Sequence, residues 1–319
     1  MRYLITGGAG FIGSHLTDAL LARGDEVVCF DNFNDYYNPA RKRQNIAGAL
    51  NHSGYTLVEA DLRDAAAVDD VFQTYKPTHV AHLGAMANPR ASVQRPLLYE
   101  EVNVRGTMHI LDAARRFDVQ HLVVASTSSV YGLSPTPWSE DLPADRPLSP
   151  YAATKRSSEL LAYTFHQQYG VPTQVVRFFT VYGPRGRPDM TPHLFVNAMV
   201  KQQPITLFNG GIGVYRDWTY IDDIVAGVTA TLDSNLPFET INLGNSNPTQ
   251  LRDFIEMLEE ATGLHAQIEQ RPLSAAEPPK TFANIDKARR LLHFEPRTQL
   301  ADGLAHFWDW YQTEVLHDA

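Results

Sequence analysis

The first half of the chain alternates short apolar runs with longer stretches whose apolar residues recur at helical spacing. The apolar runs are residues 3–6, 26–31, 55–59, 79–83, 122–125 and 173–177. The helical stretches include residues 12–23, 66–75, 99–117 and 151–169. Strands that alternate with helices at this spacing pair in parallel, because each helix carries the chain back across the sheet. We therefore expect an α/β fold built on a doubly wound parallel sheet that helices cover on both faces.

The composition of the chain changes in its second half. Gly and Pro cluster in "YGPRGRPDMTP", "FNGGIG" and "QRPLSAAEPPK", with helical patterns between them. The segment "TINLGN" predicts a late strand that returns to the main sheet. We expect residues 1–180, rejoined by about residues 218–245, to form the sheet domain. Residues 181–217 and 246–319 would then form a smaller α+β C-terminal domain.

Charge and cysteine content exclude several classes of protein. The 319 residues carry a formal net charge of −9, so nothing in the overall balance favours nucleic acid or an anionic membrane surface as a partner. The single cysteine, Cys29, rules out an internal disulfide framework and a Cys-rich metal site. We expect no metal, and we interpret His79 and His82 as structural histidines. A predicted strand follows Met1 at once, and no apolar run reaches membrane-spanning length, so we expect a cytoplasmic protein.

The segment "LITGGAGFIGSHL" indicates a dinucleotide site. Gly7, Gly10 and Gly13 lie between a predicted strand and a predicted helix. Glycines at this spacing allow a tight turn and a close approach of backbone to a pyrophosphate, and the helix start supplies N–H donors. Asp31 ends the second strand, where a carboxylate would bind ribose hydroxyls and repel a 2′-phosphate. The first domain is therefore expected to be a Rossmann-type domain that binds NAD, and Asp61 in "EADLRD" is expected to meet the adenine.

A tyrosine and a lysine lie four residues apart in "SPYAATKRSSELL". Tyr151 and Lys155 therefore share one face of the predicted helix. A phenol ionises near pH ~10 and is a poor base at neutral pH. A neighbouring ammonium and a positive nicotinamide would favour the phenolate and lower its pKa. The pair is a candidate acid–base centre.

Together these segments resemble the extended short-chain dehydrogenase/reductase family, in its NAD-dependent nucleotide-sugar epimerase/dehydratase branch. The resemblance rests on "TGGAGFIGSHL", "ASTSSVYG", "YAATK", "RFFTVYGPRGRPDM", "RDWTYIDDI" and "NLGN" and covers essentially the whole chain. It implies that Thr127 binds the sugar 4-hydroxyl beside Tyr151, and that the second domain binds the nucleotide sugar. It also implies a homodimer built by the helices at residues 99–117 and 151–169. The further cofactor contacts that we expect are Phe11, Ile12, Asn32, Leu62 and Leu83.

The hydroxyl run in "ASTSSVYG" distinguishes between the reactions of this branch. Dehydratases that resemble this chain carry Asp-Glu before "VYG", and uronate decarboxylases typically carry Glu immediately before it. Here the two positions are Ser128 and Ser129, which cannot act as general acids at neutral pH. Redox-neutral epimerisation at C4 needs no further acid. The sequence therefore favours an epimerase.

The segment "RFFTVYGPRGRPDM" is similar to UDP-glucuronate 4-epimerases of the branch. Thr180 stands where glucose/galactose epimerases usually carry Asn. Arg187 is the candidate for the sugar carboxylate, because a guanidinium offers a bidentate and always charged fork. We expect Thr127, Ser128, Ser129, Thr180 and Arg187 to hold that carboxylate out of the alignment in which a β-keto acid loses carbon dioxide.

The nucleotide half of the substrate is assigned by resemblance alone. Arg216 matches the arginine that binds the diphosphate, Phe208 lies in the segment near the uracil, and Glu277 stands where the family usually has Asp against the ribose. Arg90 keeps its family position. Met86 and Pro89 depart from the family pattern beside it.

The sequence thus predicts an NAD-dependent UDP-glucuronate 4-epimerase. The alternative is a UDP-glucose/UDP-galactose 4-epimerase, or a 4-epimerase whose specificity is relaxed so that it accepts both neutral and acidic sugars. A non-catalytic NAD-binding regulatory protein on the same fold is a third reading, against which the joint presence of Thr127, Tyr151 and Lys155 argues.

Overall fold

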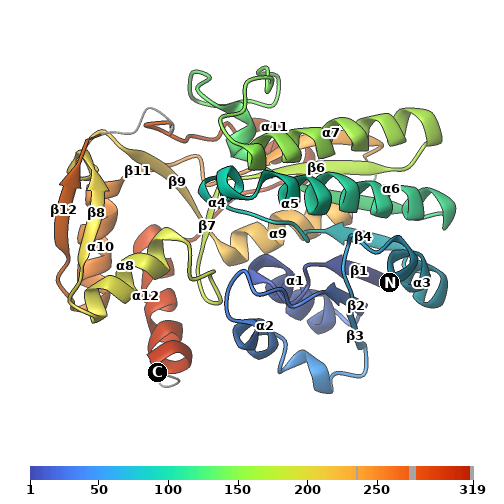
Figure 1. The fold of residues 1–319 in the computed structure, drawn as a ribbon, viewed down its shortest axis with the longest axis horizontal. Coiled ribbons are helices and arrows are strands. Elements are labelled where there is room, and N and C mark those ends of the chain that lie inside the picture. The colour runs from blue at the N-terminus through green and yellow to red at the C-terminus, as the bar shows by residue number, and fades with distance from the viewer. Residues whose placement is uncertain (235, 273–277, 317–319) are drawn as a thin grey trace.

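The structure is a computed structural model that describes residues 1–234, 236–272 and 278–316. Seven parallel strands form the central sheet, and the strand order reverses between β1 and β4 (Figure 1). Across the sheet the strands are β10 (Phe238–Leu243), β6 (Thr173–Phe178), β5 (His121–Thr127), β4 (His79–His82), β1 (Arg2–Thr6), β2 (Glu26–Asp31) and β3 (Tyr55–Glu59). The expected doubly wound parallel sheet is confirmed, and the late strand pairs with β6 as predicted.

Helices cover both faces of this sheet. One face packs against α3 (Ala65–Tyr75), α6 (Gly106–Arg116) and α7 (Pro150–Tyr169), and the other packs against α1 (Phe11–Ala22) and α9 (Ile221–Leu232). Side chains alternate along β1, so that Leu4 belongs to the first layer while Tyr3 and Ile5 belong to the second. All three are fully buried. A sheet covered on both faces requires such continuous apolar strands.

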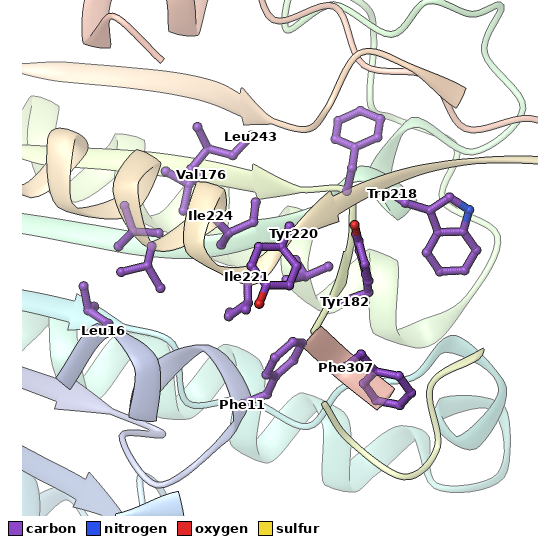
Figure 2. Packing of buried hydrophobic residues seen from close by; sticks show 14 of the residues in the cluster. Phe11, Leu16, Val176, Tyr182, Trp218, Tyr220, Ile221, Ile224, Leu243 and Phe307 are labelled. Carbon is purple, nitrogen blue, oxygen red and sulfur yellow. The ribbon is translucent and has the colours of Figure 1, made fainter. Parts of the chain in front are cut away.

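The second core layer continues into the smaller part of the molecule (Figure 2). There β7 (Thr180–Tyr182), β9 (Tyr215–Tyr220) and β11 (Pro248–Gln250) form one sheet, and β8 (Pro204–Phe208) pairs with β12 (Gln267–Arg271). The helices of this part are α8 (Thr191–Val200), α10 (Leu251–Thr262), α11 (Asp286–Leu292) and α12 (Leu300–Tyr311). Trp218 of β9 stacks on Phe254 of α10 with ring centroids 4.2 Å apart. The division into two domains that the sequence predicts stays a prediction.

Two elements differ from the sequence-based expectation. Strand β5 runs to Thr127 rather than ending at residue 125, because Ser126 and Thr127 continue the ladder opposite Arg177 and Phe178 of β6. The helix expected over residues 99–117 is continuous but changes its hydrogen-bond pattern, from α5 (Pro96–Tyr99) through a π-helical segment (Glu100–Arg105) to α6. Gly106 stands where α6 begins, and the apolar pattern alone does not reveal the π-helical segment.

The remaining elements are short. These are α2 (Pro39–Asn45), α4 (Pro89–Gln94), a 3₁₀ turn (Ala49–Asn51), a second 3₁₀ turn (Ser128–Tyr131), a third (Asn209–Gly211) and a C-terminal π-helical turn (Gln312–Leu316). Among the described residues, the helices are too short or too polar for any of them to cross a membrane.

Candidate active site

The carboxyl ends of the central strands open into a cavity at the point where the strand order reverses. Ligands bind at this place in open α/β sheets. All the residues that the sequence assigned to the cofactor line this first cavity: Gly7, Gly10, Phe11, Ile12, Gly13, Asp31, Asn32, Asp61, Leu62, Leu83, Tyr151 and Lys155. The structure therefore brings them together.

The glycine-rich turn leaves no room for side chains. A Cβ on Gly13 would lie 2.2 Å from the Gly7 carbonyl oxygen, and Gly7 itself has φ +67° and packs against the backbone of Gly84 at the end of β4. The turn thus keeps bare backbone at the start of α1, where free N–H groups can meet a pyrophosphate. This cradle fits a dinucleotide.

Asp31 is held in place at the end of β2. Its carboxylate accepts hydrogen bonds from the backbone N–H groups of Ala9, at 3.2 Å, and Phe33, at 2.9 Å. The ammonium of Lys42 lies 3.8 Å from Asp31 and 5.2 Å from the centre of the Tyr37 ring. Burial lowers the pKa of Lys42, and the neighbouring Asp31 opposes that shift. Lys42 lines the first cavity. The sequence analysis missed this residue, because a lysine in a basic helical stretch is typical of a solvent-facing surface.

Asp61 has its own partners at the end of β3. It accepts hydrogen bonds from the Asn32 amide, at 2.9 Å, and from the Arg63 guanidinium, at 3.0 and 2.8 Å. The hydrogen bonds from Arg63 contribute most to lowering the pKa of Asp61 to about 2. Asp61 therefore stays ionised and oriented beside Asn32.

Helix α7 presents Tyr151 and Lys155 to the first cavity. Ser149 caps its start by accepting from the Ala152 N–H at 3.2 Å, and Pro150 occupies its first turn. Thr127, at the end of β5, lies close enough to Tyr151 for its hydroxyl to affect the pKa of the phenol. Burial raises the pKa of Tyr151, while the Thr127 hydrogen bond and the charge of Arg187 oppose that rise.

The lowering of the Tyr151 pKa by Lys155 that we expected is therefore not found in the protein alone. Burial outweighs the favourable groups around the phenol. Burial also lowers the pKa of Lys155 to about 8, with the charge of Glu159 opposing the shift. The positive nicotinamide expected from the sequence would add a charge that favours the phenolate.

A buried carboxylate anchors this helix. Glu159, 2% exposed, pairs with Arg177 of β6 through hydrogen bonds of 2.8 and 2.7 Å. It also accepts from the Ser126 hydroxyl at 2.5 Å and from Arg156 at 2.7 Å. The hydrogen bonds and charge of Arg177 help to hold the pKa of Glu159 below its usual range despite the burial. Sequence analysis missed this residue.

A second cavity opens on the other side of Tyr151. The substrate residues predicted from the sequence that line it are Arg90, Thr127, Ser128, Ser129, Thr180, Arg187 and Arg216. Phe208, on β8, is not among the described residues that line either cavity. Glu277 lies outside the described residues. Met86 lines the first cavity and Pro89 the second.

Arg187 lines both cavities, and part of its guanidinium is already hydrogen-bonded within the protein. Its Nε and Nη2 donate to the two oxygens of Asp189 at 2.9 and 3.1 Å. We expected a bidentate fork for a substrate carboxylate, and one of the edges that could form it, Nε with Nη2, is occupied by a carboxylate of the protein. The sequence motif contains Asp189 two residues after Arg187, but nothing in the motif reveals this pairing.

No metal centre is apparent in the part of the chain that the structure describes, where no three His, Cys, Asp or Glu side chains gather closely enough to hold an ion. The His82 ring instead lies between the hydroxyls of Thr6, at 2.8 Å, and Thr107, at 3.0 Å. Burial lowers the pKa of His82 to about 3, so the ring is neutral.

The depressed pKa of Lys155 predicts a pH-dependent stability. Between about pH 8 and 10.5 the folded chain has lost the Lys155 proton while the unfolded chain still binds it. Stability then rises with pH, because the unfolded state holds more protons. We expect the free energy of unfolding of the wild type to increase relative to that of Lys155→Met across this window, in denaturant titrations at a series of pH values. Parallel curves for the two proteins would contradict the assignment.

Three comparisons place the chain among known proteins. The family model described as GDP-mannose 4,6 dehydratase matches residues 4–307. A UDP-glucuronate 4-epimerase of Thermodesulfobacterium geofontis is 41% identical over 98% of this chain and 97% of that protein. The crystal structure of UDP-glucuronic acid 4-epimerase from Bacillus cereus, in complex with UDP-glucuronic acid and NAD, superposes with a TM-score of 0.92 at 36% identity, over 98% of this chain and 99% of that one.

A neutral-sugar enzyme is also similar. The UDP-glucose 4-epimerase of Thermus thermophilus, in complex with NAD, has a TM-score of 0.89 at 32% identity, over 99% of this chain and 100% of that one. The match to the family model covers nearly the whole length, and the glycine turn, Tyr151 and Lys155 meet in one cavity. The chain belongs to the GDP-mannose 4,6-dehydratase family of extended short-chain dehydrogenases/reductases.

Proposed function

We propose that this protein is an NAD-dependent UDP-glucuronate 4-epimerase, which interconverts UDP-glucuronate and UDP-galacturonate. The observation that carries the proposal is the chemistry of the second cavity beside Tyr151. The hydroxyls of Thr127, Ser128 and Ser129 line this cavity together with Arg187. Neither Ser128 nor Ser129 stands for the acidic residue that dehydratases and decarboxylases carry at these positions. Two relatives that act on UDP-glucuronate, by their names, are 41% and 36% identical to this chain.

The first cavity is the proposed NAD site. The backbone of Gly7, Gly10 and Gly13 would hold the pyrophosphate, and Asp31 would accept hydrogen bonds from the adenosine ribose. When bound, NAD supplies a hydride acceptor, the matching hydride donor for the return step, and a positive nicotinamide charge.

Tyr151 is the proposed acid–base residue. Its phenolate accepts the proton of the sugar 4-hydroxyl, with Thr127 in the hydrogen-bond path, and returns it after the 4-keto sugar has turned over in the cavity. With NAD bound, the Lys155 ammonium and the nicotinamide charge would together stabilise the phenolate electrostatically. Because one residue serves both directions, no other acid is needed.

The hydroxyls are proposed to hold the sugar carboxylate. The 4-keto form of a uronate is a β-keto acid, which loses carbon dioxide when the breaking bond aligns with the carbonyl π system. Thr127, Ser128, Ser129 and Thr180 offer donors that hold the carboxylate away from that alignment, and Arg187 supplies charge beside them.

The nucleotide half is proposed to lie toward the smaller domain. Arg216 and Arg90 line the second cavity and would bind the diphosphate end of the substrate. Phe208 near the uracil and Glu277 at the ribose stay predictions from family resemblance. The split into an NAD-binding domain and a sugar-binding domain, and a cytoplasmic location, are likewise proposals.

A UDP-glucose 4-epimerase is the second candidate. The similarity to the enzyme of Thermus thermophilus favours it. The absence of Asn at position 180 and the gathering of hydroxyls beside Arg187 favour the acidic sugar.

Loss of the phenol should abolish the reaction without loss of the cofactor. We expect Tyr151→Phe to reduce epimerisation of UDP-glucuronate by at least about 10²-fold, because proton transfer at O4 is lost. The amount of bound NAD, measured after denaturation of the purified enzyme, should match that of the wild type. Turnover equal to that of the wild type would refute the assigned role of Tyr151.

Removal of the Arg187 guanidinium should change the products. We expect Arg187→Ala to slow epimerisation and to raise the fraction of UDP-pentose, since the carboxylate of the keto intermediate would be held less firmly. Chromatography of the 4-epimer and the pentose product measures both. An unchanged rate and an unchanged product ratio would remove Arg187 from the site.

A homodimer is proposed from the exposed apolar residues of neighbouring helices. Leu97 on α5, Met108 on α6, and Leu160 and Tyr163 on α7 are 77%, 42%, 52% and 50% exposed. Helices α6 and α7 lie side by side (Figure 1). We expect Leu160→Glu to convert a dimer into a monomer in analytical ultracentrifugation. Leu50→Glu, at a residue that is also 52% exposed but lies in the turn Ala49–Asn51, is the matched control. Equal masses for the two variants would contradict this interface.

A further inference from the structure

Asp189 lies at the meeting point of three loops that surround both cavities. Its Oδ1 accepts a hydrogen bond from Nε of Arg187, at 2.9 Å, and its Oδ2 accepts from Nη2, at 3.1 Å. Oδ2 also accepts from the Tyr36 hydroxyl, at 2.8 Å, and from the Asn88 amide, at 2.9 Å. Tyr36 follows β2, and Asn88 precedes α4. These donors keep the pKa of Asp189 at about 2 despite its burial.

The loop that holds Asn88 is itself fixed. The Asn88 side-chain oxygen accepts from the backbone N–H of Arg90 at 2.9 Å and caps α4, so the amide nitrogen faces Asp189. The Tyr99 hydroxyl donates to the Asn88 carbonyl at 3.1 Å, and the Tyr99 ring meets the Tyr151 ring edge-on with centroids 6.2 Å apart. The position of the Asp189 carboxylate is therefore set by the same framework that positions the catalytic tyrosine.

This arrangement limits what Arg187 can offer to a ligand. The two hydrogen bonds to Asp189 use the Nε and Nη2 edge of the guanidinium, which is the side-on fork. Only the end that carries Nη1 and the second Nη2 hydrogen remains for a carboxylate in either cavity. The paired charges of Arg187 and Asp189 also cancel, so a bound anion meets a weaker field than from a lone arginine.

A weaker interaction between Arg187 and the sugar carboxylate suits a substrate that must move in the middle of its reaction. Under the proposed function, the 4-keto sugar turns over in the cavity so that the opposite face of C4 receives the hydride. A carboxylate that could use either edge of an unneutralised guanidinium would be held more strongly through that turn, whereas Asp189 leaves only the end-on edge and reduces the net charge there. Tight binding of this kind lowers KM without raising kcat.

We propose that Asp189 is a positioning residue: it occupies the side-on fork of Arg187, so that the guanidinium orients the sugar carboxylate without tethering the ring while it turns over. The inference rests on the proposed function. It goes further, because it assigns to Asp189, which lines the second cavity, a role that acts through Arg187.

The test is Asp189→Asn in the NAD-loaded enzyme. We expect the variant to bind UDP-glucuronate about tenfold more tightly, because freed donors of a charged group become available to the substrate carboxylate. Its kcat should fall, since the ring is now held. The affinity for UDP, which has no sugar carboxylate, should not change. Calorimetric titrations with UDP-glucuronate and with UDP, together with kcat and KM, measure these effects.

Two further variants isolate the mechanism. Asp18→Asn makes the same change in the ion pair of Asp18 with Arg185, at 2.7 Å, and neither partner lines a cavity; we expect its constants to equal those of the wild type. In an Arg187→Gln background, Asp189→Asn should have no effect on the affinity for UDP-glucuronate, because Asp189 acts through the guanidinium.

Opposite outcomes would overturn the inference. If Asp189→Asn weakened the binding of UDP-glucuronate and UDP equally, Asp189 would have a purely structural role. An unchanged affinity for UDP-glucuronate, or tightening that persists in the Arg187→Gln background, would also reject it. Failure of the wild type to convert UDP-glucuronate would instead reject the proposed function, and the binding titrations would still decide whether Asp189 restrains Arg187.

Discussion

The buried carboxylate of Glu159 ties α7, which carries the proposed acid–base pair, to the sheet. Its two oxygens receive Arg177 from β6 and Ser126 from β5, so that three elements meet at one charge. Breaking one partner of such a buried pair costs about 3–5 kcal/mol, because the other charge is left without compensation. Lys155 lies one helical turn before Glu159, and Tyr151 one turn before that. The geometry of the acid–base centre therefore depends on this ion pair.

Three cations in and near the two cavities follow one pattern. Arg177 pairs with Glu159, Arg187 with Asp189, and Lys42 approaches Asp31. In each case a charge that faces the interior is balanced by the protein itself. Under the proposed function, an anionic substrate would be recognised by directed hydroxyls and by partly neutralised arginines rather than by a large positive field. This agrees with a net charge of −9 for a protein that is proposed to bind an anionic nucleotide sugar.

Sequence analysis predicted the parallel sheet and the cofactor cavity because each depends on local signals. The glycine turn has a fixed spacing, and Tyr151 and Lys155 are four residues apart on one helix. Glu159, Asp189 and Lys42 could not be predicted in the same way. Each lies in a stretch typical of solvated surface, and its partner comes from another element or depends on loop geometry that no periodicity describes. Burial of the phenol raises the Tyr151 pKa in the protein alone, which the spacing of Tyr151 and Lys155 does not reveal.

The most direct test of the account follows a label through one turnover. The enzyme would be incubated with UDP-glucuronate that carries deuterium at C4, and the product sugars would be separated and examined by mass spectrometry and NMR. The account predicts UDP-galacturonate that keeps the deuterium at C4, with little pentose, because the same hydride returns to the same carbon. Absence of conversion, loss of the label to solvent, or a pentose as the main product would contradict it.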